Sequence, residues 1–109
     1  MIILTGSSGG IGRKLIHKLA KIDKVLAIYN RNKPKNKILN VQYVKIDITQ
    51  EKQINKLNKY FKKNDKVIFI SLAAVKHDNL LINQLKKEFD KIINVNLQSN
   101  FLPSKFIIK

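Results

Sequence analysis

A chain of 109 residues, 44% of them hydrophobic, has the size of one domain and enough apolar side chains for a buried core. It has no cysteine, which excludes disulfides and thiolate metal sites. It has no apolar run of about 18 residues and no basic leader with a cleavage site, so we expect no membrane span and no signal peptide. These features together lead us to expect a cytoplasmic protein. The net charge of +15 attracts polyanions, but the lysines are scattered along the chain and aromatic residues are few, which favours a solvated basic surface over a nucleic-acid site.

The first elements in the chain are a strand, a glycine-rich turn and a helix. Residues 1–4 are apolar and predict the strand, and residues 5–12 read Thr-Gly-Ser-Ser-Gly-Gly-Ile-Gly. The helix is predicted over residues 11–22, with one apolar face formed by Ile11, Leu15, Ile16 and Leu19. A plain strand-to-helix loop with N-capping serines is the alternative interpretation of the turn.

The glycines of this turn indicate an anion site. Glycine permits tight turns and lets backbone N–H groups approach an anion that a Cβ would keep away, and the helix that follows aims its positively polarised N-terminus at the same place. In this arrangement Gly6 makes the turn, Gly10 permits close approach and Gly12 lets the helix pack against the sheet. A strand, such a turn and a helix in this order are typical of proteins that hold the pyrophosphate of a dinucleotide.

The rest of the chain alternates between short apolar strands and helical segments. The predicted elements are a strand at 25–29, a polar loop at 32–40, a strand at 41–46, a helix at 50–62 capped by Thr49, a strand at 67–71 and helix from about residue 80 onward. The strand at 67–71 is continuously apolar, as expected of a strand covered on both faces, and Pro103 is expected to kink or interrupt the last helix. This order predicts an α/β fold, a Rossmann-type doubly wound parallel sheet truncated after about four strands.

Four segments in the right order resemble the short-chain dehydrogenase/reductase family. They are the glycine turn at 5–12, the pair Asn30-Arg31 after the second strand, the pair Asp47-Ile48 after the third strand, and Asn94-Val95-Asn96-Leu97 in a later helix. The similarity runs along essentially the whole chain. It implies that residues 1–109 are a partial NAD(P)-binding Rossmann domain of an oxidoreductase, without the family's C-terminal catalytic and substrate-binding part.

The end of the second strand bears on the choice of cofactor. An acidic residue about 20 residues after the glycine turn would bind the ribose hydroxyls and select NAD, whereas this sequence has Asn30 and Arg31 there. A carboxylate repels a 2′-phosphate and a guanidinium can grip it with paired hydrogen bonds, so NADP is favoured over NAD. The alternative is that Arg31 is a solvated loop residue.

The resemblance assigns further residues to the cofactor. It implies that Asp47 and Ile48 border the adenine ring, although Asp47 before a helix is also a candidate cap. After the fourth strand the family commonly carries Asn-Asn-Ala-Gly, where this chain has Ser71-Leu72-Ala73-Ala74, and the two alanines are small enough to lie beside a cofactor. The full set of predicted cofactor-binding residues is Gly6, Ser7, Ser8, Gly10, Ile11, Gly12, Arg31, Asp47, Ile48, Ala73 and Ala74.

The catalytic residues of the family are not matched. The resemblance implies that Asn96 is the helix asparagine that helps to hold a water in a proton relay, but the Ser and the Tyr-x-x-x-Lys helix would follow a fifth strand, so we expect the 109 residues alone to lack hydride transfer. The spacing also leaves the classical and extended branches open, because Gly9 fits the extended pattern as well.

Other reactive side chains carry no catalytic or metal prediction. Tyr29 and Lys33 have the Tyr-x-x-x-Lys spacing by coincidence, since they lie at a strand end and in a loop. Ser71 has no base nearby in sequence, and His17 and His77 have no companion at metal-ligand spacing. A non-catalytic nucleotide-binding or protein-interaction module is the alternative to the oxidoreductase, and a full-length form is a candidate homo-oligomer.

Overall fold

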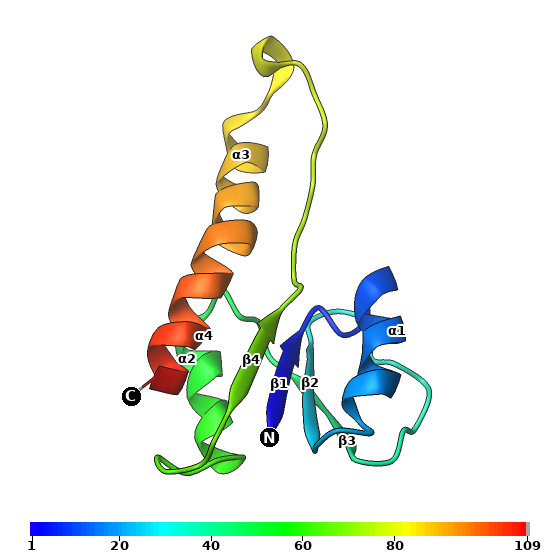
Figure 1. The fold of residues 1–109 in the computed structure, drawn as a ribbon. Coiled ribbons are helices and arrows are strands. Elements are labelled where there is room, and N and C mark those ends of the chain that lie inside the picture. Colours follow the sequence, from blue (N-terminus) through cyan, green and yellow to red (C-terminus); the bar gives the residue numbers. More distant parts are fainter. Residues whose placement is uncertain (109) are drawn as a thin grey trace.

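The computed structural model describes residues 1–108, and its centre is a parallel sheet of four strands (Figure 1). The strands lie in the order β3-β2-β1-β4, with bounds Val41–Lys45, Val25–Tyr29, Ile2–Thr5 and Ile68–Ser71. β1 pairs in register with both neighbours, Ile2 opposite Val25 on one side and Ile68 on the other. The chain therefore moves outward from β1 to β3 and then crosses to β4, which confirms the α/β fold and the parallel sheet.

Helices cover both faces of the sheet. They are α1 (Gly10–Leu19), α2 (Glu51–Ile54), the 3-10 helices η1 (Asn55–Lys59) and η2 (Leu81–Asn83), α3 (Lys86–Ile93), the π-helical turn η3 (Asn94–Gln98) and α4 (Ser99–Ile108). Figure 1 shows α1 on one side of the sheet and α2 with α4 on the other. In the same view α3, η3 and α4 form one long rod whose upper part stands clear of the sheet. Within residues 1–108, no helix has both the length and the apolar content to cross a membrane.

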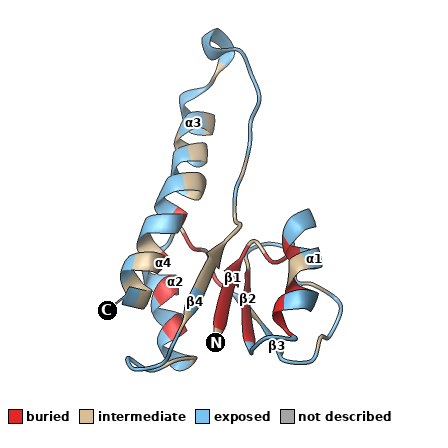
Figure 2. Ribbon diagram, viewed as in Figure 1, coloured by how far each residue is buried: buried red, intermediate tan, exposed pale blue. Residues whose placement is uncertain are grey.

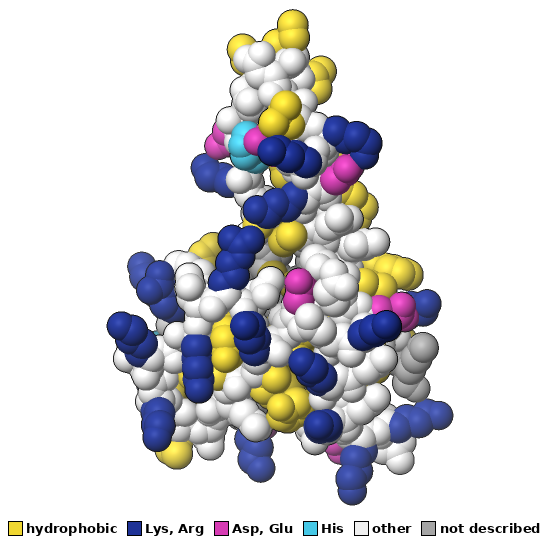
Figure 3. All heavy atoms as spheres, turned by 180° about the vertical axis from the view of Figure 1, so that it is seen from behind, with side chains coloured by type: hydrophobic (Ala, Val, Ile, Leu, Met, Phe, Trp, Pro, Cys, Tyr) yellow, Lys and Arg dark blue, Asp and Glu magenta, His cyan; other side chains and the backbone are white. Residues whose placement is uncertain are grey.

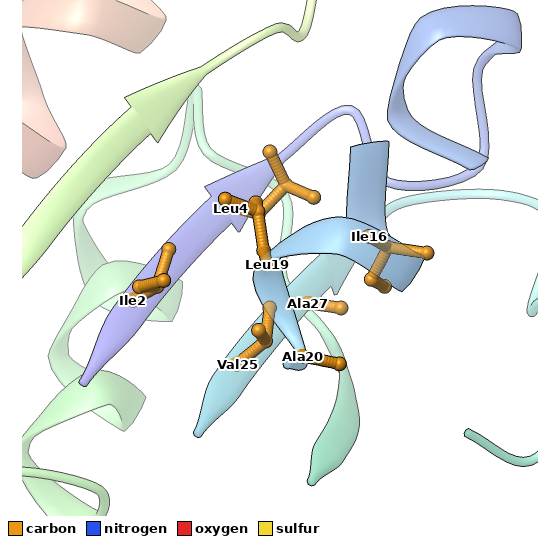
Figure 4. Packing of buried hydrophobic residues seen from close by; sticks show 7 residues of the cluster. All are labelled: Ile2, Leu4, Ile16, Leu19, Ala20, Val25 and Ala27. Carbon is orange, nitrogen blue, oxygen red and sulfur yellow. The ribbon is translucent and has the colours of Figure 1, made fainter. Parts of the chain in front are cut away.

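Two buried clusters hold these layers together. Alternate residues of β1 point to opposite faces, so Ile2 and Leu4 join one cluster and Ile3 the other. The α1 side contains Ile2, Leu4, Ile16, Leu19, Ala20, Val25 and Ala27 (Figure 4), and the opposite side contains Ile3, Leu26, Ile28, Ile46, Ile48, Ile54 and Leu57. Leu102 and Phe106 of α4 pack against the second cluster. Figure 2 shows this burial concentrated in β1 and β2, the central strands. Both strands are covered on both faces, which explains their continuous hydrophobicity.

The first helix differs from its prediction at both ends. α1 ends at Leu19, and Ile22 beyond it is 74% exposed. Ile11 is 71% exposed and does not belong to the apolar face. The buried face instead runs through Gly12, Ile16 and Leu19, because the helix packs closely on the glycine turn and turns Ile11 outward.

The segment after β3 also differs from the predicted helix at 50–62. Only α2 is α-helical, and η1 tightens the chain into a 3-10 helix that ends at Lys59. The cap residue is Gln50, without a side-chain cap, because the Thr49 hydroxyl donates its hydrogen bond to Asp47 Oδ1 at 2.6 Å. The assignment of Thr49 as a helix cap is therefore wrong.

Two further predictions are corrected by the packing around β4 and α4. β4 is the outer strand of the described sheet. Ile70 packs against the cluster on the α1 side and Phe69 against the opposite one, but Ile68 is 57% exposed, so this apolar run is covered on both faces only in part. Pro103 is buried inside α4 and does not interrupt it. The departure from regular α-helix lies in η3, immediately before α4.

Candidate functional site

A cleft of about 490 Å³ opens where the four parallel strands end. Each strand contributes a residue at or just after its carboxyl end: Thr5 from β1, Tyr29 from β2, Ile46 after β3 and Leu72 after β4. The carboxyl edge of a parallel sheet is the usual place for a ligand in such folds. Of the predicted cofactor-binding residues, those that line this cleft are Gly6, Ser8, Arg31, Asp47, Ile48, Ala73 and Ala74.

The glycines at 6, 10 and 12 meet different surroundings. Gly6 has a φ of +68°, and a Cβ there would lie 2.6 Å from the carbonyl carbon of Leu72. A Cβ at Gly12 would overlap the carbonyl oxygen of Gly6. A Cβ at Gly10, by contrast, would meet nothing within 4 Å. The protein itself therefore requires glycine at 6 and 12, while the space at Gly10 remains open next to the start of α1.

The start of α1 supplies backbone donors to this region. Gly9 is the N-cap with extended backbone, and Arg13 N–H returns to the Gly9 carbonyl at 2.9 Å. The N–H groups at the first helical positions lack intrahelical acceptors and carry the positive end of the helix dipole. Gly10 and Ile11 are exposed here and lie outside the lining of the cleft.

The two serines of the turn have different roles in the structure. Ser7 is 1% exposed, and its hydroxyl donates a hydrogen bond to the Ile28 carbonyl at 2.9 Å. Ser7 therefore ties the turn to β2 and does not line the cleft. Ser8 is half-buried and does line it. Neither serine makes the side-chain N-cap of the alternative interpretation, because α1 begins without such a bond.

Thr5 supports the opposite wall, and sequence reasoning did not select it as a site residue. It is fully buried, and its Oγ1 accepts hydrogen bonds from Leu72 N–H at 3.2 Å and Ala73 N–H at 3.4 Å. It also donates to Ser71 Oγ at 3.4 Å. The hydroxyl holds the chain after β4 against the glycine turn. The signal in the sequence is a polar threonine at the end of an otherwise aliphatic strand.

Asp47 makes local hydrogen bonds at the third strand's end. Its Oδ1 accepts from both the N–H and the hydroxyl of Thr49, at 3.0 and 2.6 Å, and its own N–H donates to Gln53 Oε1 at 2.9 Å. This carboxylate forms an Asx-type turn ahead of α2 and still borders the cleft. Ile48 beside it is 8% exposed and belongs to the core as well as to the cleft wall.

Asn96 lies in η3 and reaches the cleft through Val75. Its Nδ2 donates to the Val75 carbonyl and its Oδ1 accepts from Val75 N–H, both at 2.8 Å. Val75 lines the cleft and Asn96 does not. Both ends of the amide are thus used to fix one peptide segment of the wall. π-helical turns occur often at functional sites, because the inserted residue redirects side chains.

The long helical rod brings two further residues to the cleft, Lys91 and Val95. They are four residues apart and face the same side of the rod, a spacing that the sequence shows but that does not reveal what the face covers. Lys91 and Arg31 are the cationic side chains of the cleft, and Asp47 is the acidic one. Tyr29 lines the cleft, whereas Lys33 lines a different cavity, so this pair does not converge on one site.

No metal centre is found in the part of the chain that the structure describes, since no three His, Asp or Glu side chains come together there. His77 is paired with Glu88, Nε2 to Oε1 at 3.0 Å. His17 lies on α1, away from the cleft lining.

Comparisons with known proteins agree with this geometry. A 3-oxoacyl-(acyl-carrier-protein) reductase FabG of Buchnera aphidicola is 31% identical over 98% of this chain and 47% of its own length, and one of Rickettsia bellii is 29% identical over 98% and 46%. The crystal structure of a short chain dehydrogenase from Leptospira borgpetersenii with bound NAD+ superposes with a TM-score of 0.84 at 23% identity, covering 97% of this chain and 43% of that one. The structure of ElxO with NADP bound gives a TM-score of 0.83 at 25% identity, covering 96% and 47%.

The chain spans about half the length of the curated relatives it matches. The family model described as short chain dehydrogenase matches residues 1–109. With the parallel sheet, the glycine turn and the cleft at the strand ends, this match shows that the chain belongs to the short-chain dehydrogenase family.

Proposed function

We propose that the cleft binds a nicotinamide dinucleotide, with NADP preferred over NAD, and that residues 1–109 are the cofactor-binding part of an oxidoreductase. The observation that carries the proposal is the contrast among the glycines. A Cβ at Gly6 or Gly12 would clash with the protein's own backbone, whereas a Cβ at Gly10, at the N-terminus of α1, would meet no atom within 4 Å. A glycine with open space beside unsatisfied helix N–H groups fits the binding of a pyrophosphate, whereas the packing of the protein does not require glycine at this position.

We propose a pose in which the residues assigned to the cofactor by the family resemblance border its parts. Asp47 and Ile48 would border the adenine, Arg31 would lie near the adenosine ribose at the end of β2, and Ala73 and Ala74 would lie beside the nicotinamide; all of these residues line the cleft. Bound NADPH would supply the hydride. The residues of this chain would bind and orient it, and Asn96 would act as a positioning residue that fixes Val75.

For the reaction class we propose reduction of a 3-oxoacyl thioester by a longer protein that contains this segment. The support is that curated relatives matching 98% of the chain are named 3-oxoacyl-(acyl-carrier-protein) reductases. For residues 1–109 alone the proposal is binding without hydride transfer, because they do not match the Ser and the Tyr-x-x-x-Lys helix of the family.

We also propose that a full-length form is a homo-oligomer. The rod exposes apolar side chains at intervals of four residues, namely Phe89 54%, Ile93 40%, Leu97 64% and Phe101 58% exposed. A contiguous apolar stripe of this kind is typical of a surface that packs against another. Light scattering of a full-length form and of its Leu97→Asp variant tests this, and a monomeric parent would contradict it.

The cofactor proposal is tested by titrating the chain with NADPH and with NADH and following the fluorescence of the reduced nicotinamide. We expect both to bind, NADPH more tightly, and we expect Arg31→Asp to weaken NADPH by about tenfold or more while affecting NADH less, because a carboxylate repels the 2′-phosphate. Lys63→Asp is the matched control, since Lys63 lines a separate groove between α2 and α4. Equal affinities in the parent, or equal losses in both variants, would overturn the preference for NADP.

A further inference from the structure

The long helical rod forms one wall of the cleft and brings a single cation, Lys91, to it. Lys91 and Val95 of the rod line the cleft together with Val75. Lys91 is exposed, whereas Val95 is half-buried. The Asn96 amide fixes Val75 against the rod through two hydrogen bonds of 2.8 Å. The wall therefore combines two aliphatic side chains with one ammonium group.

The rod reaches the cleft from the face of the sheet opposite to α1. Leu102 and Phe106 of α4 pack against the cluster that contains Ile46 and Ile48, and Figure 1 shows α4, η3 and α3 continuing from there as one rod. Ile46 and Ile48 follow β3 and also line the cleft. Lys91 thus enters the cleft on the side of Ile48, and the start of α1, where we propose the pyrophosphate, belongs to the other side.

Asp47 gives this side of the cleft a negative charge. Both hydrogen bonds that its carboxylate accepts from Thr49 go to Oδ1, so Oδ2 keeps its capacity to accept from a ligand. A phosphate near Lys91 would meet the repulsion of this carboxylate. A carboxylate and an ammonium group together suit a neutral group that presents both a hydrogen-bond donor and an acceptor.

Adenine has this combination of groups. Its exocyclic amine donates and the ring nitrogen N7 beside it accepts. Its flat ring packs well on aliphatic side chains, which Ile48, Val75 and Val95 provide, and a cation near an aromatic ring adds a further attraction. The stem of a lysine covers apolar surface while its ammonium group stays at the polar edge.

We infer that Lys91 is a specificity-determining residue for the adenine base, with its ammonium group donating to a ring nitrogen from the wall opposite Asp47. This inference rests on the proposed function, because it takes the dinucleotide to lie in the cleft with its adenine at Asp47 and Ile48. Of the ion pairs formed within residues 1–108, none includes Lys91, so its ammonium group is available to a ligand. NADPH and NADH share the adenine, so Lys91 acts on both alike, in contrast to Arg31.

The test replaces Lys91 by methionine, which keeps an unbranched aliphatic side chain and removes the charge. Figure 3 shows lysines and arginines spread over the face of the molecule turned away from the view of Figure 1, so the experiment needs a control for the loss of charge in general. Lys87→Met is that control, because Lys87 is exposed, lies one turn earlier on α3 and does not line the cleft. Circular dichroism checks that both variants fold as the parent does.

Four ligands separate the adenine from the rest of the cofactor. NADPH, NADH and 5′-AMP carry adenine, whereas reduced nicotinamide mononucleotide carries a phosphate and the nicotinamide without adenine. Fluorescence follows the three reduced nicotinamides, and isothermal titration calorimetry follows 5′-AMP.

We expect Lys91→Met to weaken NADPH, NADH and 5′-AMP by a similar factor of about five or more, because a hydrogen bond from a charged donor is lost. The affinity for the mononucleotide should stay within about twofold of the parent's, and Lys87→Met should leave all four affinities within about twofold. Equal losses in the two variants, or a loss for the mononucleotide as large as for 5′-AMP, would overturn the inference and leave dinucleotide binding standing. Failure of the parent to bind any of the four ligands would overturn the proposed function and this inference together.

Discussion

A Cβ at Gly12 would overlap the carbonyl oxygen of Gly6 and would lie 2.9 Å from the Cα of Ser7. The first turn of α1 thus rests directly on the glycine turn, without space for a side chain between them. The partner atoms belong to the backbone, which cannot move aside as the end of a flexible side chain can.

The first prediction compares Gly12→Ala with Gly10→Ala. We expect Gly12→Ala to lower the free energy of unfolding by about 3 kcal/mol, because the added methyl group forces the backbone of the turn apart. Gly10→Ala should change it by less than about 1 kcal/mol, since the space is open and alanine favours helix. Urea denaturation followed by circular dichroism measures both.

The order of the two variants should reverse when dinucleotide affinity is measured on the folded proteins: Gly10→Ala should weaken binding more than Gly12→Ala does. Gly10→Ala should retain the fold and lose dinucleotide affinity, because its methyl group occupies the space proposed for the pyrophosphate. If Gly10→Ala binds NADPH as the parent does, the pyrophosphate does not lie at this glycine.

The second prediction separates Ser7 from Ser8. Ser7→Ala should lower the free energy of unfolding by about 1–2 kcal/mol, because it leaves the Ile28 carbonyl without its 2.9 Å partner in a buried place. Ser8→Ala changes a residue that lines the cleft and should leave the free energy of unfolding within about 0.5 kcal/mol of the parent's while weakening NADPH binding. Equal stability losses would show that the two serines share one role.

β1, β2 and β4 could be predicted because they are apolar runs with turn residues between the elements, and β3 because apolar and polar residues alternate along it. β1 and β2 lie in the centre of the sheet, and their sequence shows it directly. The run at 67–71 has the same character and forms β4, the outer strand of the four described, where Ile68 is 57% exposed. The apolar spacing puts Ile11 on the buried face of α1, but Ile11 is 71% exposed, because spacing alone does not show that Gly12 is the point of closest contact.

The candidate site could be predicted only where a local pattern marks it. Gly6, Arg31, Asp47 and Ala73 lie at the ends of strands, and these ends meet at one edge of any parallel sheet. Lys91 reaches the same cleft from a helix about 60 residues further along the chain than Arg31, and no local pattern encodes that approach. Arg13 of α1 and Lys33 of the loop after β2 likewise line one cavity only because that loop folds against α1.

The third prediction concerns the amide of Asn96. Asn96→Ala should lower the free energy of unfolding by about 1–2 kcal/mol, because both polar groups of Val75 lose their partners. The Val75 amide should also exchange its hydrogen faster, which hydrogen exchange by NMR measures directly. Asn96→Asp keeps the acceptor for Val75 N–H and loses the donor to its carbonyl, so protection of that amide should be largely retained.

Asn100→Ala is the control for this experiment. The Asn100 side chain is exposed and donates to the Asn96 carbonyl at 2.6 Å, so its removal leaves the pair with Val75 in place. We expect the exchange of the Val75 amide to remain at the parent's rate in this variant. Faster exchange there as well would assign the protection to the helix as a whole and not to the Asn96 side chain.

The fourth prediction is a pH dependence of stability that originates at Asp23. The Met1 ammonium group donates to Asp23 Oδ2 at 2.7 Å and Lys24 N–H donates to Oδ1 at 2.6 Å, and these hydrogen bonds hold the pKa of Asp23 below its ordinary value of 3.8. A folded-state pKa below the unfolded one stabilises the protein above the unfolded pKa, and this contribution is lost as the pH falls through the folded pKa. Asp23→Asn should therefore be less stable than the parent at pH 7, and the difference should shrink as the pH falls below the ordinary pKa of 3.8 and through the lowered pKa of Asp23. Urea denaturation between these pH values measures the difference, with Asp78→Asn as the control because Asp78 pairs with the exposed Lys76 instead. A constant difference between Asp23→Asn and the parent across this range would show that the carboxylate does not titrate with folding.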